Sequence, residues 1–334
     1  MLSVRVIQGF IYWGGGSRRF IYDPSKLDPD APSWMANKLQ TAIPGALFGL
    51  DRALAFLLDH FWLLYAAILL FSAVELIVGF ALMAGFLTRL AALMSVGLSV
   101  SLMLLFGWQG GTCVDEWTMA ACNVAMGATL MLAGSAAYSL DDAWLSRDPT
   151  LAQKAWFRWC GGSLRLPLSA DGFRNLALLV LGLVLVFDVG LYNYYRGSVL
   201  TPYHGGPVSA AAHHLALSDA AILPDGGVRF TITLDGGTPA VPAHVMKVEV
   251  VSAEGKPLAT WDWRSLSALP ASAIVNAFPY DKVKSGPYGL EAGMGASAIV
   301  TLPPPANAIP PMSGARLRVT DVDGKTFTSG LVSG

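Results

Sequence analysis

The sequence predicts a membrane-embedded bundle of about five transmembrane α-helices, followed by an all-β, sandwich-like domain outside the membrane. Three observations predict this fold class. The 334 residues are 54% hydrophobic and only 13% charged, about half the usual charged share. Long apolar stretches fill the first two thirds, and β-rich runs separated by turn residues fill the rest. We therefore expect a transmembrane domain at 1–196 and a β domain at 197–334.

Four stretches are long and apolar enough to cross a bilayer, which requires about 20 residues. They are Phe61–Phe86, Leu90–Trp108, Trp117–Tyr138 and Asn175–Tyr195. The first contains one charged residue, Glu75, and the last contains Asp188. The run Val6–Trp13 is too short alone. With the residues before it and the glycines after it, we expect a first helix of marginal length.

Lysine and arginine near the helix ends predict the orientation, because they are enriched on the cytoplasmic side. The connection before the last span carries five of them: Arg147, Lys154, Arg158, Arg165 and Arg174. This connection and the N-terminus are therefore predicted to be cytoplasmic. The loop 107–117 and the β domain then lie outside. We expect a multi-pass protein of the inner cell membrane with a periplasmic C-terminal domain.

The pattern at 30–58 predicts an amphipathic helix on the outer membrane surface, broken at Pro32 and Pro44. Beyond Gly197 the pattern changes to strands. Runs at 228–234, 244–251, 297–302 and 315–320 are rich in β-formers and several of them alternate. The sequence DVDGKTFTSGLV adds an Asp-Gly hairpin signal. These runs and their turn-rich linkers favour a small sandwich.

Composition also excludes several classes of function. The formal net charge is −1 and no stripe dense in lysine or arginine occurs, so we expect no nucleic-acid partner. Three cysteines are too few for a disulfide scaffold. The sequence contains no metal-ligand spacing and no haem, iron–sulfur, flavin or nicotinamide motif, so no such cofactor is predicted. The lipid bilayer is an expected partner, and homo-oligomerisation is left open.

Two stretches resemble a known family with high specificity: FIYWGGGSRRFIYDPSKLDP, which begins at Phe10, and VELIVGFALMAGFLTRLAAL at 74–93. They are similar to fused DoxD–DoxA thiosulfate:quinone oxidoreductases, whose membrane part is DoxX-like. The two parts are separate chains in some archaea. The resemblance implies oxidation of two thiosulfates to tetrathionate, with membrane quinone as electron acceptor. The rival hypothesis is a non-catalytic scaffold whose sandwich binds a redox or sulfur-handling partner through exposed strand edges.

Arg18 and Arg19, with Lys26 nearby, are the first candidates for substrate binding. Thiosulfate is a dianion with sulfonate oxygens, and arginine presents a planar fork of donors suited to them. The three preceding glycines are expected to form a turn whose N–H groups join this cradle. The alternative is that both arginines are interfacial anchors that reach toward lipid headgroups.

Cys113 and Cys122 are the candidate sulfur relay, because both are predicted near the outer face. Thiosulfate can attack a disulfide to give a mixed intermediate. Nine helical residues, however, span roughly 13 Å, against about 4.4–6.8 Å between the Cα atoms of a disulfide. The loop would therefore have to fold back. The alternative for Cys122 is ordinary helix packing. Cys160 is predicted to be cytoplasmic and inert in this reaction.

Glu75 lies near the middle of its span, where a carboxylate is by default a functional candidate. It is a suitable proton donor for quinone reduction. The alternative is a structural hydrogen bond to Asn123 or to the first helix. His60 stands beside Trp62 at the outer start of the same span, and the pair is a candidate quinone-binding site. An interfacial histidine is the competing interpretation. Asp188 is expected to cap a helix or pair with a neighbouring one.

Overall fold

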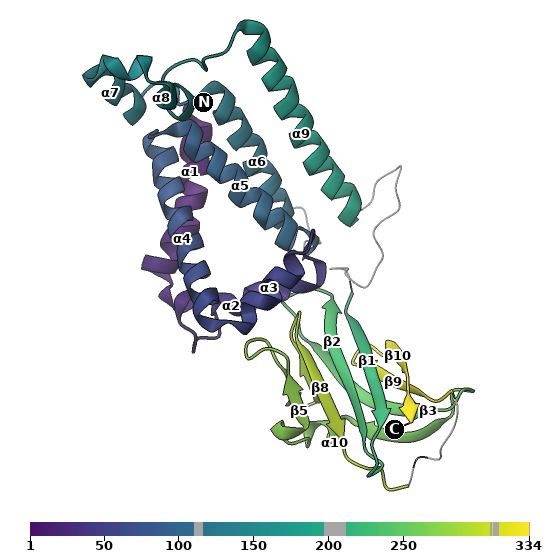
Figure 1. Cartoon of the computed structure of the whole chain (residues 1–334). Helices are drawn as coiled ribbons and strands as arrows, with labels where there is room; N and C mark the ends of the chain where they lie inside the picture. The colour runs from purple at the N-terminus through teal and green to yellow at the C-terminus, as the bar shows by residue number, and fades with distance from the viewer. Residues whose placement is uncertain (110–115, 197–211, 308, 310–313, 334) are drawn as a thin grey trace. The chain divides into compact units, whose positions relative to one another are not determined.

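The computed structural model describes residues 1–109, 116–196, 212–307, 309 and 314–333 (Figure 1). The chain forms two compact units. The helical unit comprises Met1–Met35 and His60–His204, and the second unit comprises Ala36–Asp59 and Gly205–Gly334. The fold class predicted from the sequence is confirmed, since an N-terminal helical region is followed by an all-β domain of two sheets.

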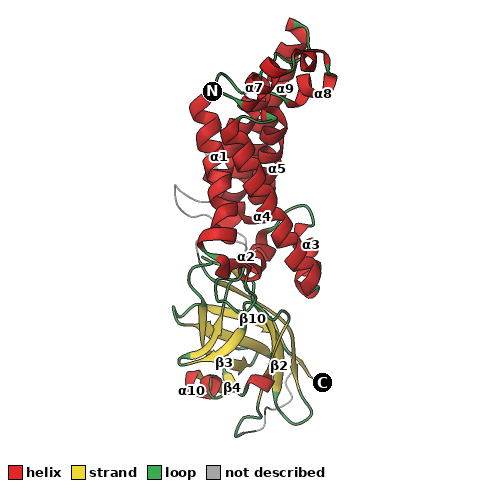
Figure 2. Ribbon diagram, turned by 90° about the vertical axis from the view of Figure 1, so that its left-hand side faces the viewer, coloured by secondary structure: helices red, strands yellow, loops and turns green. Residues whose placement is uncertain are grey.

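The helical unit is built from apolar helices that pack side by side (Figure 2). Its α-helices are α1 (Leu2–Ser17), α4 (Phe61–Ala84), α5 (Thr88–Phe106), α6 (Glu116–Ala133), α7 (Leu140–Arg147), α8 (Ala155–Cys160) and α9 (Ala170–Arg196). Short 3₁₀ and π turns join them: η1 (Arg18–Tyr22), η2 (Pro24–Leu27), η4 (Gly107–Gln109) and η5 (Pro149–Gln153).

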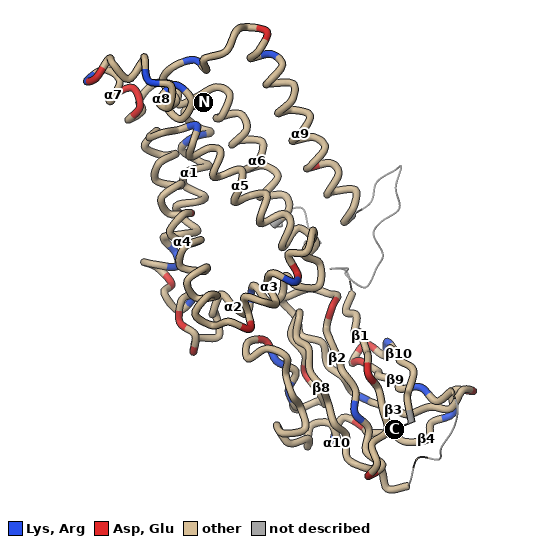
Figure 3. Tube along the Cα trace, in the orientation of Figure 1, with Lys and Arg blue, Asp and Glu red and all other residues tan. Residues whose placement is uncertain are grey.

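Three helices are long and apolar enough to cross a membrane within the described residues: Phe61–Ala84, Thr88–Gln109 and Ala170–Tyr195. The stretch expected to span at 117–138 is a shorter apolar helix, because it ends at Ala133. Figure 3 shows α4, α5 and α6 free of charged residues along most of their length. Charges gather instead around α7 and α8, at the end of the bundle that holds the N-terminus.

The glycines at 14–16 do not form the turn predicted from the sequence, because they continue α1 as regular helix. Gly16, together with Gly9 of the same helix, instead permits a close crossing with α4. A Cβ added to Gly16 would lie 2.7 Å from the Leu76 nitrogen, and one added to Gly9 would lie 2.7 Å from the Gly79 carbonyl oxygen. A Cβ on Gly79 would overlap the Trp13 backbone. Small residues at such crossings let membrane helices pack backbone to backbone.

The corner between α4 and α5 is fixed by a glycine and by a distant carboxylate. Gly85 ends α4 with a φ of 69°, and the Phe86 N–H donates back to the Ala81 carbonyl at 2.8 Å. Asp141 then caps α5, since its carboxylate accepts from the Leu87 and Thr88 N–H groups at 2.7 and 3.0 Å. An anionic cap also suits the positive end of the helix dipole.

Helix α9 makes few contacts in the helical unit. Only 6% of its most apolar stretch is buried there. Trp117 contacts Tyr192 with ring centroids 5.2 Å apart, which joins α9 to α6 near the C-terminal end of α9. The partner expected for Asp188 is not found in the part of the chain that the structure describes. Its Oδ1 atom is buried there without a hydrogen bond.

The β domain is a two-sheet sandwich. One sheet has the order β11-β1-β2-β8-β5, and the other has the order β10-β9-β3-β7-β6, with β4 paired to β3. The strands are β1 (His214–Ile222), β2 (Val228–Gly236), β3 (Ala243–Val251), β4 (Pro257–Asp262), β5 (Ile274–Asn276), β6 (Val283–Gly286), β7 (Gly289–Ala292), β8 (Ser297–Leu302), β9 (Arg316–Asp321), β10 (Thr326–Gly330) and β11 (Val332–Ser333). A short helix, α10 (Trp263–Ser267), follows β4, and a 3₁₀ turn, η6 (Ala271–Ala273), precedes β5.

Alternation along the strands builds the core between the two sheets. In β2, Val228, Phe230, Ile232 and Leu234 are fully buried, while the residues between them are not. The four strand runs predicted from the sequence correspond to β2, β3, β8 and β9. The Asp-Gly signal is also confirmed, because Gly324 turns between β9 and β10 with a φ of 79°.

The second unit also contains a segment from the N-terminal third of the chain. It consists of α2 (Met35–Ala42), η3 (Ile43–Gly45) and α3 (Leu50–Asp59). The sequence predicts an amphipathic helix here, and the structure resolves it into these shorter helices. Their apolar side chains Leu54 and Leu58 are buried, and η3 contacts β2.

Candidate functional site

The most informative constellation is an ion pair between two residues singled out from the sequence. Arg19, in η1, donates through Nη1 to the Glu75 carboxylate of α4. Glu75 is 5% exposed. The same arginine nitrogen lies 3.4 Å from the Ser72 hydroxyl, which itself donates to the Ile68 carbonyl at 2.7 Å. A charge pair in such an apolar helix neutralises two groups that are costly there alone.

The glycines of α1 make room for this carboxylate. A Cβ on Gly15 would lie 3.2 Å from the Glu75 Oε2 atom, and one on Gly16 would press on the backbone of Leu76. A larger side chain at either position would displace Glu75 or push the helices apart. Gly15 and Gly16 therefore leave space for Glu75 and for the close approach of α4.

Adjacent arginines have different surroundings. Arg18 is exposed, whereas Arg19 turns inward to the carboxylate. Neighbouring residues of a helical turn point in different directions, which fits the different surroundings of the two guanidinium groups. Of the three predicted anion-binding residues, Arg19 is the one that pairs with Glu75, so the charges of Arg18 and Lys26 are not committed to that carboxylate. Lys26 lies in η2, and its Nζ is 3.9 Å from an Asp23 oxygen.

A buried polar cluster continues along the same face of α1. The Gln8 amide donates to the Ser95 hydroxyl at 3.1 Å and to the Asn123 carbonyl at 2.8 Å. The Tyr12 hydroxyl donates to the Ser95 carbonyl at 2.7 Å and also contacts the Ser99 hydroxyl. Hydrogen bonds from α1 to α5 and α6 thus hold the bundle together where apolar packing alone gives little specificity.

Glu75 does not pair with Asn123, one of the two structural partners considered from the sequence. The side-chain nitrogen of Asn123 donates to the Met119 carbonyl of its own helix at 3.0 Å. Glu75 pairs instead with the turn that directly continues α1. The sequence contains a pattern that predicts this polar face of the first helix. Gln8, Tyr12 and Arg19 recur at spacings of four and seven, which place them on one helix face.

The predicted quinone residues lie apart from the ion pair along α4. His60 is the N-cap of α4, and Trp62 is 79% exposed on its first turn. Glu75 lies thirteen positions after Trp62, which corresponds to roughly 20 Å of helix. The structure therefore does not gather the predicted quinone residues and the predicted proton donor in one place.

The structure describes only one of the two cysteines of the predicted sulfur relay. Cys122 is an exposed free cysteine on α6, and Cys160 is a half-buried free cysteine at the end of α8. Cys113 lies outside the described residues. The pairing of Cys113 with Cys122 therefore stays a prediction.

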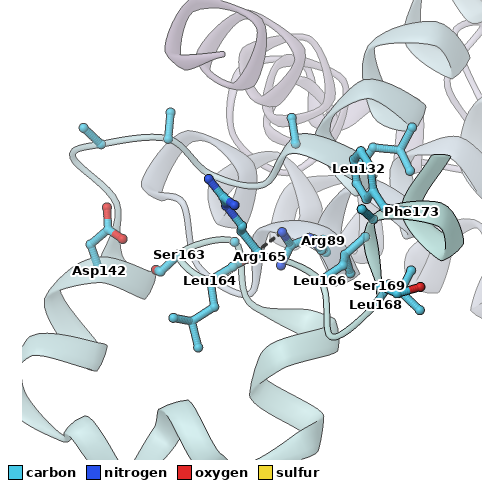
Figure 4. Close-up of a pocket in the computed structure, with 15 residues that line it drawn as sticks. Arg89, Leu132, Asp142, Ser163, Leu164, Arg165, Leu166, Leu168, Ser169 and Phe173 are labelled. Atoms are coloured by element: carbon cyan, nitrogen blue, oxygen red, sulfur yellow. Dashed lines mark hydrogen bonds between the residues drawn. The ribbon is translucent and has the colours of Figure 1, made fainter. Parts of the chain in front are cut away.

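A separate cavity of about 750 Å³ lies between the ends of α5 and α6 and the start of α9 (Figure 4). Arg89 and Arg165 both line this cavity, and Figure 4 shows Asp142 and Phe173 on opposite sides of it. Arg89 donates to the carbonyls of Met131, Gly161 and Leu164 at 3.1, 2.5 and 2.7 Å. It therefore ties the chain after α8 to the bundle, which is a structural role.

Comparison with known families decides what the chain is. The family model described as TQO small subunit DoxD matches residues 1–168, which is half of the chain. The model described as TQO small subunit DoxA matches residues 209–330.

The chain belongs to the DoxD family.

It also carries a DoxA domain on the same polypeptide. The DoxD match covers the helices that hold Arg19 and Glu75, and the DoxA match covers the sandwich. TQO stands for thiosulfate:quinone oxidoreductase, so the chain is related to an oxidoreductase with a quinone acceptor. Together with the three apolar helices, this indicates an oxidoreductase-related protein of the membrane.

Proposed function

We propose that this DoxD–DoxA protein is a membrane thiosulfate:quinone oxidoreductase that forms tetrathionate. The observation that carries the proposal is the presence of both TQO small-subunit modules on one chain. The ion pair of Arg19 with Glu75 supports it, because it places a cation and a proton carrier together in the apolar bundle. We assign 1–196 to the membrane domain and 197–334 to a periplasmic DoxA domain.

The reaction balances as follows. Two thiosulfates lose two electrons and join through a new S–S bond as tetrathionate. The quinone takes up the two electrons and two protons and becomes quinol. Exposed Arg18, with Lys26, receives the dianion. When an anion also binds Arg19, Glu75 loses its counter-charge and takes up a proton. Because Glu75 and Trp62 lie roughly 20 Å apart along α4, this proton reaches a quinone at the start of the helix through intervening polar groups or water and not by direct transfer. His60 and Trp62 are proposed to bind the quinone at the start of α4.

The sulfur route proposed for the electrons passes through a Cys113–Cys122 disulfide. One thiosulfate attacks the disulfide, forms an S–S bond to one cysteine and releases the other as a thiolate. A second thiosulfate displaces tetrathionate, which releases the second thiolate. Quinone then oxidises the two thiols back to the disulfide. Direct electron transfer from an arginine-bound thiosulfate pair to quinone is the alternative route.

Cysteine variants separate the two routes. Cys113→Ser or Cys122→Ser abolishes turnover by the covalent route, because a serine oxygen cannot form the mixed sulfur intermediate. Cys160→Ser is the matched control and stays active. Thiosulfate without quinone leaves a mass adduct on one cysteine, and quinone removes it. An active Cys113→Ser/Cys122→Ser double variant contradicts the covalent route and leaves direct transfer.

The scaffold hypothesis is tested with the purified protein alone. With thiosulfate and a soluble quinone analogue, an enzyme bleaches the quinone absorbance without any other protein. A scaffold gives no bleaching until its redox partner is added, and that result contradicts the proposed function.

A further inference from the structure

We infer that the helical segment Ala36–Asp59 is a docking element that holds the DoxA domain noncovalently, independently of the chain connection at 197–211. The segment belongs to the DoxD match, whereas the sandwich belongs to the DoxA match. Both nevertheless lie in one compact unit. The contact between them thus joins the two family modules.

Gln40 of α2 carries this contact. Its side chain is fully buried, and all of its polar atoms bond to the DoxA backbone. The amide nitrogen donates to the carbonyls of Asp281 and Gly295 at 2.9 and 3.1 Å. The amide oxygen accepts from the Asp281 N–H at 3.0 Å. An unmade hydrogen bond at such a buried amide is costly, so the pairing specifies one position of α2 on the sandwich.

Gly295 makes the close approach possible. It turns between β7 and β8 with a φ of 76°, and a Cβ there would overlap the Gln40 backbone carbonyl. Gly324 has nearly the same φ of 79° in the β9–β10 turn, but a Cβ there would meet nothing within 4 Å. The two glycines therefore share the backbone strain of an alanine substitution, and only Gly295 adds a clash with the docking segment.

The far end of the segment is also attached. The Tyr280 hydroxyl donates to the Leu58 carbonyl at the end of α3 at 3.2 Å. Leu58 itself is 2% exposed. Contacts at both α2 and α3 therefore flank residues 280–281 of the DoxA domain. The segment therefore contacts the DoxA domain at two points, as one subunit contacts another, although both parts belong to one chain. It does not depend on the reaction proposed above.

The test uses the full chain with a protease site introduced within residues 197–211. After cleavage in detergent, an affinity tag on the N-terminus retrieves the helical fragment, and retention of the DoxA fragment is measured. We expect wild type and Gly324→Ala to retain it. Gly295→Ala and Gln40→Leu are expected to release it at least tenfold faster. Gln153→Leu, the same change at an exposed glutamine of η5, should behave as wild type.

Release from wild type on cleavage overturns the inference, and so does equal release from Gly295→Ala and Gly324→Ala. Near-ultraviolet circular dichroism shows whether Gly295→Ala keeps a folded sandwich. If Gly295→Ala does not keep the sandwich folded, the Gln40→Leu variant provides the test, because residue 40 lies outside the DoxA domain. Retention in that variant then overturns the inference.

Discussion

At the scale of single residues, Arg18 and Arg19 are expected to have different roles: Arg18 in substrate binding and Arg19 in stabilising the fold. Arg18→Ala should raise the thiosulfate KM about 10- to 100-fold, because a charge-assisted contact contributes about 1.5–3 kcal/mol. The thermal stability of the Arg18→Ala variant should equal that of wild type, since Arg18 is exposed. Arg19→Ala should lower stability by about 3–5 kcal/mol, because it leaves Glu75 charged and buried without a partner.

The double variant Arg19→Ala/Glu75→Gln provides the control. Removing both charges should recover a substantial part of the lost stability. Steady-state kinetics and thermal unfolding in detergent measure the two effects, and exposed Arg52→Ala on α3 serves as a neutral reference. An unchanged KM and kcat in Arg18→Ala and Arg19→Ala would contradict a role of either arginine in substrate binding.

Asp281 gives the DoxA domain a predicted pH dependence. Burial raises the pKa of its carboxyl to about 6, and Lys284 opposes this only in part. The folded state therefore keeps a proton that the unfolded state releases near pH 4. The contribution of this carboxyl to the free energy of unfolding is therefore most favourable below pH 4, falls as the pH rises and levels off above pH 6.

Asp281→Asn should remove this decline and gain about 1 kcal/mol at pH 7.5, allowing for partial exposure of the carboxyl. Urea unfolding of the full chain at pH 4.5 and 7.5, followed by near-ultraviolet circular dichroism, measures the difference. A variant whose pH profile matches wild type shows that the carboxyl is not desolvated.

At the scale of elements, the crossing of α1 and α4 positions the ion pair, and two glycines test it. Gly79→Ala should destabilise the protein by about 1–3 kcal/mol, because its Cβ overlaps the Trp13 backbone. Gly97→Ala on α5 should be neutral or slightly stabilising, since nothing lies within 4 Å of its Cβ position. Thermal unfolding compares the two. Equal effects would mean that α1 and α4 do not cross closely.

Much of the element pattern follows from local sequence. Long apolar runs predict α4, α5 and α9, and β-rich runs predict β2, β3, β8 and β9. The turn predicted at Gly14–Gly16 was wrong, because three glycines favour a turn locally while packing of α1 against α4 keeps them helical. The alternatives considered for Glu75 were Asn123 and the first helix, and only the tertiary fold identifies its partner as Arg19, in the turn directly after α1. The pairing of Gln40 with Asp281 joins residues 241 positions apart, so no local pattern contains it.

At the scale of the whole molecule, the positive-inside rule makes a testable statement about topology. Arg147, Arg158 and Arg165 lie near α7 and α8, and the N-terminus lies at that same end of the helical unit (Figures 1 and 3). This end should be cytoplasmic, and residues 197–334 should be periplasmic. A single cysteine at position 146 should resist a membrane-impermeant thiol reagent in intact cells. Labelling of that position from outside contradicts the topology.

The central claim is that this chain alone moves electrons from thiosulfate to quinone. The most direct measurement counts products from the purified protein with thiosulfate and a quinone analogue, in the absence of any other protein. One tetrathionate should appear for each quinol formed, since both reactions involve two electrons. Quinol formation without tetrathionate, or no turnover until a second protein is added, would contradict the claim.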